Sequence, residues 1–182
     1  MAKWLWGGVA VIATIGGAAM FWEPLAAEKA AAPSPKSYDV EIVRDGFGVP
    51  HINGKTDADA AYGLAFAHAE DDFSTIEEVV SMTRGRYGAI AGQDGAKVDF
   101  VFHLLGVRDT VERRYSEVPA DVRAVLDAYA AGLNHYAEKH PEEVRLSNLF
   151  PVNGKDIVAG FVLRAPFFYG LDNYISTLVE GK

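Results

Sequence analysis

DVEIVRDGFGVPHI, residues 39–52, predicts more about the fold than any other stretch, because it holds two short strand patterns around a glycine turn. Val40 and Ile42 alternate with side chains that a half-buried strand turns towards solvent. Gly46 and Gly48 can adopt positive φ angles in a tight connection. We therefore expect a β-hairpin at the start of the folded region.

The residues before this hairpin follow the order of an export leader. Lys3 precedes a run without charged residues from Trp4 to Trp22, and a polar tail follows. Crossing a bilayer takes roughly 20 apolar residues, so residues 1–27 fit either a cleaved signal peptide, which we favour, or an uncleaved membrane anchor. Residues 28–37 are rich in alanine, proline and serine, as in a linker. We expect a periplasmic or secreted protein that is folded over 38–182 and meets a membrane only through such an anchor.

The charge and composition of the chain exclude several kinds of partner and site. The sequence has 17 Lys and Arg against 25 Asp and Glu, and removing the three lysines and two glutamates of residues 1–37 leaves 14 against 23, a net charge of −9. This charge disfavours nucleic acid and anionic lipid surfaces, so we predict no nucleic acid partner. The sequence has no cysteine, which excludes disulfides, thiol catalysis and thiolate zinc sites within it.

Two amphipathic helices are predicted from apolar residues that recur every three or four positions. Thr56 or Asp57 can cap the first, which runs to about Met82. Its apolar face begins with alanines, which let a helix approach its neighbour closely: Ala61, Ala65, Ala69, Phe73, Ile76 and Val80. The second helix starts near Pro119 and ends near His140. Its apolar positions are Val122, Leu126, Tyr129, Leu133 and Tyr136.

The remaining segments carry weaker signals. Residues 84–95 hold four glycines without the ending of a phosphate loop, so we predict a plain loop. Residues 98–106 form an apolar run that fits either a helix or a buried strand. Residues 149–156 (LFPVNGKD) indicate a turn, and Asp156 can cap the helix that follows. The last piece, 157–178, is apolar and aromatic.

The densest aromatic patch is the best candidate for a binding site. In RAPFFYGLDN, residues 164–173, Pro166 and Gly170 interrupt regular helix, so the rings lie where a pocket wall can form. The plainer interpretation is core packing, since aromatic side chains dominate protein cores. Composition and spacing leave both interpretations open.

No catalytic constellation occurs within the sequence. The HExxH, GxSxG and SxxK patterns are all absent. His68 lies at helical spacing from Asp71 and Asp72, but no nucleophile accompanies this pair, so we interpret His68 as structural and His51 as a satisfied core or interface histidine. The acidic cluster at 70–78 lacks calcium-loop spacing. We expect it to be a solvated helix face with one or two buried carboxylates, and we predict no catalytic residue in this chain.

Five strings, taken in order, resemble the amino-terminal region of the penicillin acylase family of N-terminal nucleophile hydrolases. They are VRDGFGVPHI (43–52), AYGLAFAHAEDDF (61–73), GRYGAIAG (85–92), DAYAAGLN (127–134) and FPVNGKD (150–156). The ordered set spans nearly all of residues 38–182. The strings are most similar to acylases that deacylate acyl-homoserine lactones or lipopeptides, and penicillin and cephalosporin acylases are close behind.

The resemblance implies a subunit of a secreted hydrolase that acts on linear amide C–N bonds. A precursor in this family cuts itself into a small α chain, which this sequence resembles, and a large β chain. The N-terminal serine of the β chain is the nucleophile, and its own α-amino group is the base. The expected fold is α+β, the helix-rich α-chain part of a four-layer αββα sandwich with an early β-hairpin. The expected partners are the β chain and a small acylated amine, namely an acyl-homoserine lactone, a lipopeptide or a penicillin-type β-lactam.

The resemblance also implies site residues. The last helical stretch of the α part lines one wall of the acyl pocket, and the corresponding side chains here are Phe161, Leu163, Phe167, Phe168 and Tyr169. No cofactor is required for catalysis, but some members bind a structural calcium ion, for which Asp172 is the nearest counterpart. The chain departs from the family at residues 69–72, where an aspartate replaces a common arginine.

A second interpretation belongs to a different class of protein. The apolar run 4–22 and the missing nucleophile also fit a membrane-tethered or periplasmic interaction module without catalytic activity. Such a module would fold alone. An α part would instead expose a large apolar surface without its partner.

Overall fold

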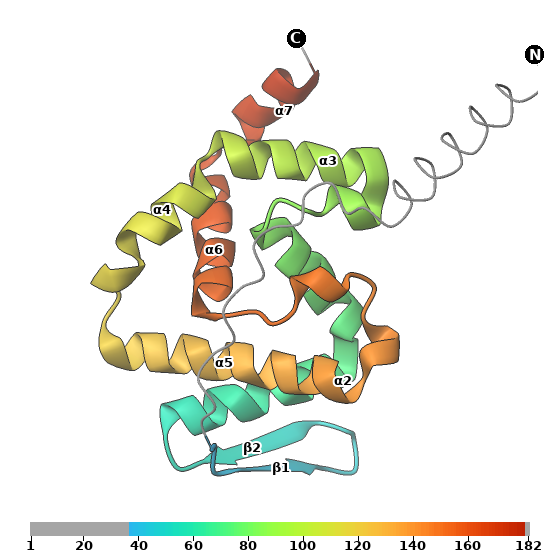
Figure 1. Cartoon of the computed structure of the whole chain (residues 1–182), viewed down its shortest axis with the longest axis vertical. Helices are drawn as coiled ribbons and strands as arrows, with labels where there is room; N and C mark the ends of the chain where they lie inside the picture. Colours follow the sequence, from blue (N-terminus) through green and yellow to red (C-terminus); the bar gives the residue numbers. More distant parts are fainter. Residues whose placement is uncertain (1–36, 181–182) are drawn as a thin grey trace, which may run out of the picture.

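The computed structural model describes residues 37–180, which form an assembly of helices with one β-hairpin at its end (Figure 1). The strands are β1 (Val40–Arg44) and β2 (Pro50–Gly54). The helices are α2 (Asp57–Thr83), α3 (Gly88–Leu104), α4 (Val107–Arg114), α5 (Ala120–Lys139), α6 (Gly154–Arg164) and α7 (Asp172–Glu180). Four short 3₁₀ helices connect them: η1 (Tyr115–Glu117), η2 (Pro141–Glu143), η3 (Ser147–Leu149) and η4 (Ala165–Tyr169).

This architecture confirms the expected fold class, since the described residues are helix-rich and carry an early hairpin. The predicted leader, residues 1–27, and linker positions 28–36 lie outside the described residues. Over residues 37–180, no helix combines the length and the hydropathy that crossing a bilayer requires.

The predicted β-hairpin is confirmed, and it packs on α2. β1 and β2 are antiparallel, with Ile42 opposite Ile52. A Cβ atom at Gly63 of α2 would lie 2.6 Å from the Val40 side chain and 2.9 Å from that of Ile52. The even-numbered strand residues therefore face α2, and Gly63 provides the room for them.

Helix α2 begins and ends close to the predicted positions but bends in its middle. The Thr56 side chain accepts a hydrogen bond from the backbone N of Asp59 (3.2 Å), and the Asp59 carboxylate accepts from the backbone N of Thr56 (3.0 Å), a reciprocal capping box. Asp72 has non-helical angles, φ −158° and ψ 67°. Its carboxylate accepts from the backbone N of Thr75 (3.2 Å). Asp72 thus caps the second half of α2, and the change of direction is visible in Figure 1.

The main core lies between α2 and α5, where small residues let the two helices approach closely. All six predicted apolar positions of α2 are buried. On α5 the closest approach is at Gly132, where a Cβ atom would lie 2.4 Å from the carbonyl oxygen of Tyr62. The predicted α5 face is wrong at its start, because Val122 is 44% exposed and the core shared with α2 begins only near Tyr129.

The prediction of a plain loop over residues 84–95 is wrong from Gly88 onward. Helix α3 starts there because the Asp99 carboxylate accepts hydrogen bonds from the backbone N atoms of the N-cap residue Tyr87 and of Gly88, at 2.7 Å each. Gly92, with φ 61°, interrupts the helix once. The apolar run 98–106, which fitted a helix or a strand, belongs to this helix up to Leu104.

Candidate functional site

An apolar groove of about 820 Å³ lies between the C-terminal half of α2, helix α3 and the segment from α6 to α7. Small-molecule sites have volumes of about 300–1,000 Å³ and mostly apolar linings. The groove is lined by Val79, Met82 and Thr83 of α2, by Lys97, Val98 and Val101 of α3, and by Ile157, Gly160, Phe161, Leu163, Arg164, Phe167, Asp172 and Ile175. The groove has the size and lining of a site for an apolar ligand.

The structure brings three of the five predicted pocket residues into this groove. Phe161, Leu163 and Phe167 line it, whereas Phe168 and Tyr169 are 81% and 90% exposed and are not among its lining residues. Consecutive residues of a 3₁₀ helix are rotated by about a third of a turn, so the neighbouring rings of η4 point in different directions. The role of all five in substrate binding stays a prediction.

Sequence reasoning missed the wall of the groove that α2 and α3 provide. Val79 and Met82 lie beside the predicted buried face of α2, and Val79 is 48% exposed. Val98 and Val101 belong to the apolar run that spacing alone could not assign. The sequence signal for this wall was the adjacent apolar pair Val79 and Val80, because it widens the apolar face of α2.

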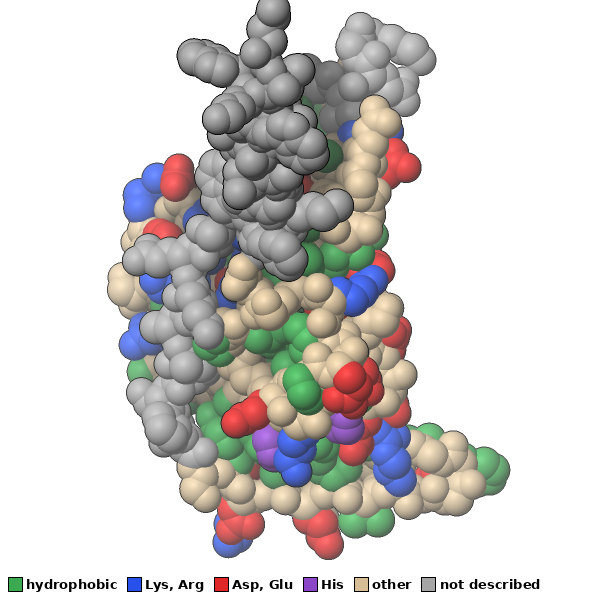
Figure 2. Space-filling view, turned by 45° about the vertical axis from the view of Figure 1, so that its right-hand side comes forward, with side chains coloured by type: hydrophobic (Ala, Val, Ile, Leu, Met, Phe, Trp, Pro, Cys, Tyr) green, Lys and Arg blue, Asp and Glu red, His purple; other side chains and the backbone are tan. Residues whose placement is uncertain are grey.

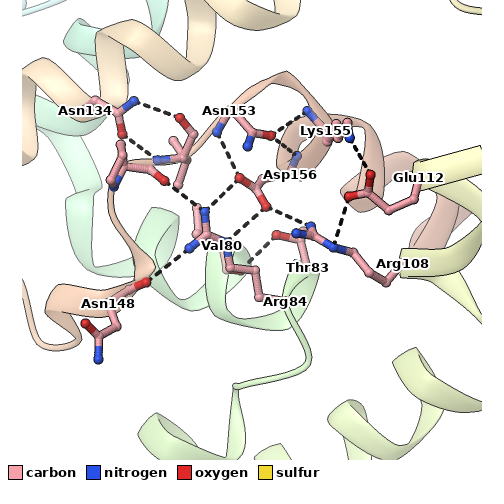
Figure 3. Close-up of polar contacts among 12 residues, drawn as sticks. Val80, Thr83, Arg84, Arg108, Glu112, Asn134, Asn148, Asn153, Lys155 and Asp156 are labelled. Carbon is pink, nitrogen blue, oxygen red and sulfur yellow. Dashed lines mark hydrogen bonds and ion pairs between the residues drawn. The ribbon is translucent and has the colours of Figure 1, made fainter. Parts of the chain in front are cut away.

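A buried ion pair fixes the groove wall formed by α6 against the end of α2 (Figure 3). Arg84 follows α2, and its guanidinium donates to the two carboxylate oxygens of Asp156 at 3.0 and 2.8 Å. The Arg84 and Asp156 side chains are 4% and 0% exposed. The guanidinium also donates to the carbonyl oxygens of Asn148 (3.2 Å) and Pro151 (3.0 Å). Bidentate pairing of this kind fixes orientation as well as distance.

Asp156 does not cap α6 in the predicted way. Asn153 is the N-cap residue, and its side chain accepts from the backbone N atoms of Lys155 (2.9 Å) and Asp156 (3.3 Å). Asp156 occupies the third helical position, and its carboxylate accepts from the backbone N of Asn153 (2.9 Å). Arg108 of α4 adds a further contact to that carboxylate at 3.4 Å. The carboxylate is thus shared between the capping box and the buried ion pair, which holds the first turn of α6 in place.

A second buried carboxylate, Glu77, explains part of the acidic cluster on α2. Its side chain is 0% exposed and pairs with Arg145 at 2.7 Å, and it also accepts from the backbone N of Leu146 (2.8 Å). Glu70 and Asp71 are exposed and pair with Arg44 of β1. The cluster is therefore a solvated face with one buried carboxylate, as predicted.

His68 and His51, the two histidines considered from the sequence, each contact another side chain. His68 Nδ1 lies 2.9 Å from the Tyr129 hydroxyl, a contact that joins α2 to α5. His51 is not a core histidine, because its side chain is 64% exposed on the outer face of the hairpin. It pairs with Asp45 at 3.3 Å. No catalytic pair of His68 with Asp71 or Asp72 is among the described hydrogen bonds and ion pairs of residues 37–180.

Within residues 37–180, Asp172 belongs to no group of three converging carboxylate or imidazole ligands. This aspartate is exposed at the start of α7 and lines the groove. Calcium takes six to eight oxygen ligands, yet the group of three potential ligands that converges within residues 37–180 is His140, Glu142 and Glu143, which is at the end of α5. Calcium at Asp172 stays a proposal that needs ligands from elsewhere.

A tyrosine that packs on the start of α6 has a raised pKa. Burial, followed by the nearby Asp127 carboxylate, raises the pKa of Tyr115 to about 12. Its hydroxyl donates to Asp127 at 3.4 Å. A Cβ atom at Gly154 would lie 2.1 Å from this hydroxyl, so the start of α6 packs directly on Tyr115. The raised pKa of Tyr115 thus results from its burial beside α6 and from the neighbouring carboxylate.

Comparisons with known proteins identify relatives of this chain. Residues 39–163 match the family described as penicillin amidase. The chain is 33% identical over 100 residues to penicillin acylase 2 proenzyme from Pseudomonas sp. (strain SE83), an alignment that covers 55% of this chain and 13% of the relative. It is 32% identical over 112 residues to acyl-homoserine lactone acylase PvdQ from Pseudomonas putida (strain KT2440), covering 57% of this chain and 14% of the relative. The aligned region thus spans about one seventh of these curated relatives.

A solved structure has a similar fold. Thermostable penicillin G acylase from Alcaligenes faecalis superposes with a TM-score of 0.58 and 25% sequence identity. The superposition covers 70% of this chain and 72% of the solved chain. The two chains are therefore of similar length.

Proposed function

Because the chain belongs to the penicillin amidase family, we propose that it is the α-chain part of an acylase, a hydrolase that cleaves the linear amide bond between an acyl group and an amine. The observation that carries this proposal is the family match over residues 39–163. The relatives' names support an acyl-homoserine lactone or a penicillin-type β-lactam as the acylated amine, and the sequence resemblance adds a lipopeptide. Family membership favours this function over a non-catalytic interaction module.

The nucleophile of the proposed enzyme lies on a β chain from the same precursor. One relative is named a proenzyme, and the chain aligns with only about one seventh of it. The superposition with the solved acylase chain of similar fold covers 72% of that chain. Both observations support a small subunit that works beside a larger one.

The chemistry proposed for that β chain is acyl transfer through its N-terminal serine. The serine hydroxyl oxygen attacks the amide carbonyl carbon while the serine's own α-amino group takes the hydroxyl proton. Hydrogen-bond donors of the β chain stabilise the oxyanion. The C–N bond then breaks, the proton passes to the leaving amine, and water hydrolyses the serine ester to release the acid.

The contribution proposed for this chain is an apolar wall for the acyl group. Phe161 and Phe167 lie on one side of the groove, with Val79 and Val98 on the other. Burying each methylene of an acyl chain contributes about 0.8 kcal/mol, so the groove can select acyl groups by length and shape. The Arg84–Asp156 pair keeps the α6 side at a fixed position relative to α2.

Export to the periplasm or medium is part of the same proposal. It rests on the leader pattern of residues 1–27. Fusing residues 1–37 to a reporter that is active only after export tests it. A fusion that is expressed at normal levels but stays inactive would contradict export.

The acyl preference of the enzyme assembled from this chain and its β chain tests the role of the groove. Phe161→Ala and Phe167→Ala should each shift the ratio of kcat/KM between a long and a short acyl amide by about tenfold, since a truncated ring removes a contact that the longer acyl group makes. Phe168→Ala is the matched control, because Phe168 is exposed outside the groove. If all three variants shifted the kcat/KM ratio equally, the groove would not determine the acyl preference.

A further inference from the structure

Hydrogen bonds hold the turn of the β-hairpin, residues 45–49, in one conformation. One carboxylate oxygen of Asp45 accepts from the backbone N atoms of Phe47 (2.8 Å) and Val49 (3.0 Å). The backbone N of Gly48 donates to the carbonyl oxygen of Asp45 (3.0 Å), and the backbone N of Asp45 donates to that of Val49 (3.1 Å). Gly48 has φ 85°, which favours glycine. The tip of the hairpin is therefore preorganised.

This rigid turn presents apolar side chains to solvent. Phe47 is 95% exposed, more than any other described large hydrophobic residue, although turns are usually built from small and polar residues. Successive strand residues point to opposite faces, and Ile42 and Ile52 face α2. Val43 and Val49, which are 50% and 53% exposed, therefore lie on the outer face. We name Val43, Phe47 and Val49 the tip patch; in Figure 2 the hairpin projects at the lower right and ends in hydrophobic side chains.

Acidic groups lie near the hairpin tip, mainly on the side that faces α2. Arg44 joins the turn to α2, since its guanidinium donates to the carbonyl oxygen of Gly48 (2.8 Å) and pairs with Glu70 and Asp71 at 2.9 Å each. With Asp45, one arginine thus stands among three carboxylates. Asp45 also pairs with His51. This end of the molecule is thus acidic on the side next to the patch, so a partner with basic groups beside an apolar site would complement it.

The length of the curated relatives indicates which polypeptide covers the tip patch. The family match begins at residue 39, so the hairpin belongs to the shared region. Alignments with the curated relatives include only 13% and 14% of their lengths, and most of a family polypeptide therefore lies outside this chain. A rigid, solvent-facing aromatic ring flanked by apolar groups is typical of an interface hot spot, because little ordering is needed when it binds.

We infer that the tip patch anchors this chain to the β chain, with Phe47 inserted into an apolar socket whose rim is basic. The inference rests on the proposed function for the existence of the β chain. It places an attachment site on the hairpin, which lies at the opposite end of the described structure from α7 (Figure 1).

Copurification and titration of the two chains test the inference. With the α part tagged and both chains expressed from the precursor gene, Phe47→Ala should raise the dissociation constant for the β chain at least about tenfold, and Phe47→Leu should restore most of the affinity. Phe100→Ala, on α3, is the matched control because Phe100 is also exposed, at 52%. The thermal midpoint of the 182-residue chain should be the same in Phe47→Ala and wild type, because so exposed a ring contributes little packing. Glu70→Lys should also weaken binding by reversing an acidic charge near the hairpin tip.

Several results would contradict the inference that the tip patch anchors this chain to the β chain. A dissociation constant within about twofold of wild type for Phe47→Ala would do so, as would copurification of no second chain with the wild type. An equal loss with Phe100→Ala or a lowered thermal midpoint in Phe47→Ala would assign the effect to a general surface or folding role. Self-association of the wild-type chain that Phe47→Ala abolishes would replace the β chain by a second copy. Failure of the proposed function is distinguishable, because an assembled wild type without activity on any acyl amide leaves the affinity measurement intact.

Discussion

Replacing Asp156 by alanine would leave the Arg84 guanidinium buried without its counter-ion. The Arg84 side chain is 4% exposed, so water cannot readily solvate the charge. The carbonyl oxygens of Asn148 and Pro151 remain as acceptors, but they carry no full charge. Removing one partner of a buried ion pair typically costs about 3–5 kcal/mol. We expect a loss of about 4 kcal/mol, a large share of the roughly 5–15 kcal/mol that stabilises a typical domain.

Two further variants separate the charge effect from general damage to α6. Lys155→Ala breaks the neighbouring pair with Glu112, whose side chains are 35% and 43% exposed, and it should cost less than about 1 kcal/mol. Combining Asp156→Ala with Arg84→Met removes the stranded charge and replaces it by an apolar side chain. We expect the double variant to be about 1–2 kcal/mol more stable than Asp156→Ala alone.

Urea unfolding followed by far-ultraviolet circular dichroism measures these differences, provided that the transitions share one slope. The reasoning would be refuted if Asp156→Ala unfolded within about 1 kcal/mol of wild type. It would also fail if the double variant lost as much stability as its two single variants added together, because that result would mean that the two side chains do not interact.

The remaining predictions concern packing and pH. Gly132→Ala should destabilise the chain by about 1–3 kcal/mol, because its Cβ atom would lie 2.4 Å from the Tyr62 carbonyl oxygen; Gly160→Ala, whose Cβ atom would meet only the Thr83 methyl at 3.5 Å, should be neutral or slightly stabilising, and equal unfolding midpoints would contradict this contrast. Tyr115 should ionise near pH 12 rather than at the ordinary pKa of 10. Since the fold favours its protonated form, its contribution to stability is complete below pH 10 and is lost as the pH rises towards 12. Phenolate absorbance compared between wild type and Tyr115→Phe checks this, and a difference centred near pH 10 would argue against it.

Features decided by residues close in sequence were predictable. The Thr56 cap needs only Asp59, three residues away, and the end of α6 needs only the Pro166 to Gly170 break. The hairpin likewise follows from alternation and Gly48. In each case the signal and the structure that it specifies lie within one turn or one strand pair.

Features that depend on distant residues were not predictable. Helix α3 starts where it does because Asp99 caps it from eleven residues away. The partners Arg84 and Asp156 are 72 residues apart, and neither spacing nor composition points from one to the other. The groove shares this origin, since α2, α3 and α6 meet only after folding. Sequence could not tell that Phe167 lines the groove and Phe168 does not, because the direction of a side chain in η4 depends on that packing.

The central claim is that this chain serves an enzyme whose nucleophile is the first residue of another chain. Mass spectrometry of the polypeptide that copurifies with the tagged chain, after expression of the whole precursor gene, tests it most directly. We expect a large chain that begins with serine and carries a free α-amino group. An active assembly whose second chain begins with a residue other than serine, threonine or cysteine would contradict the claim.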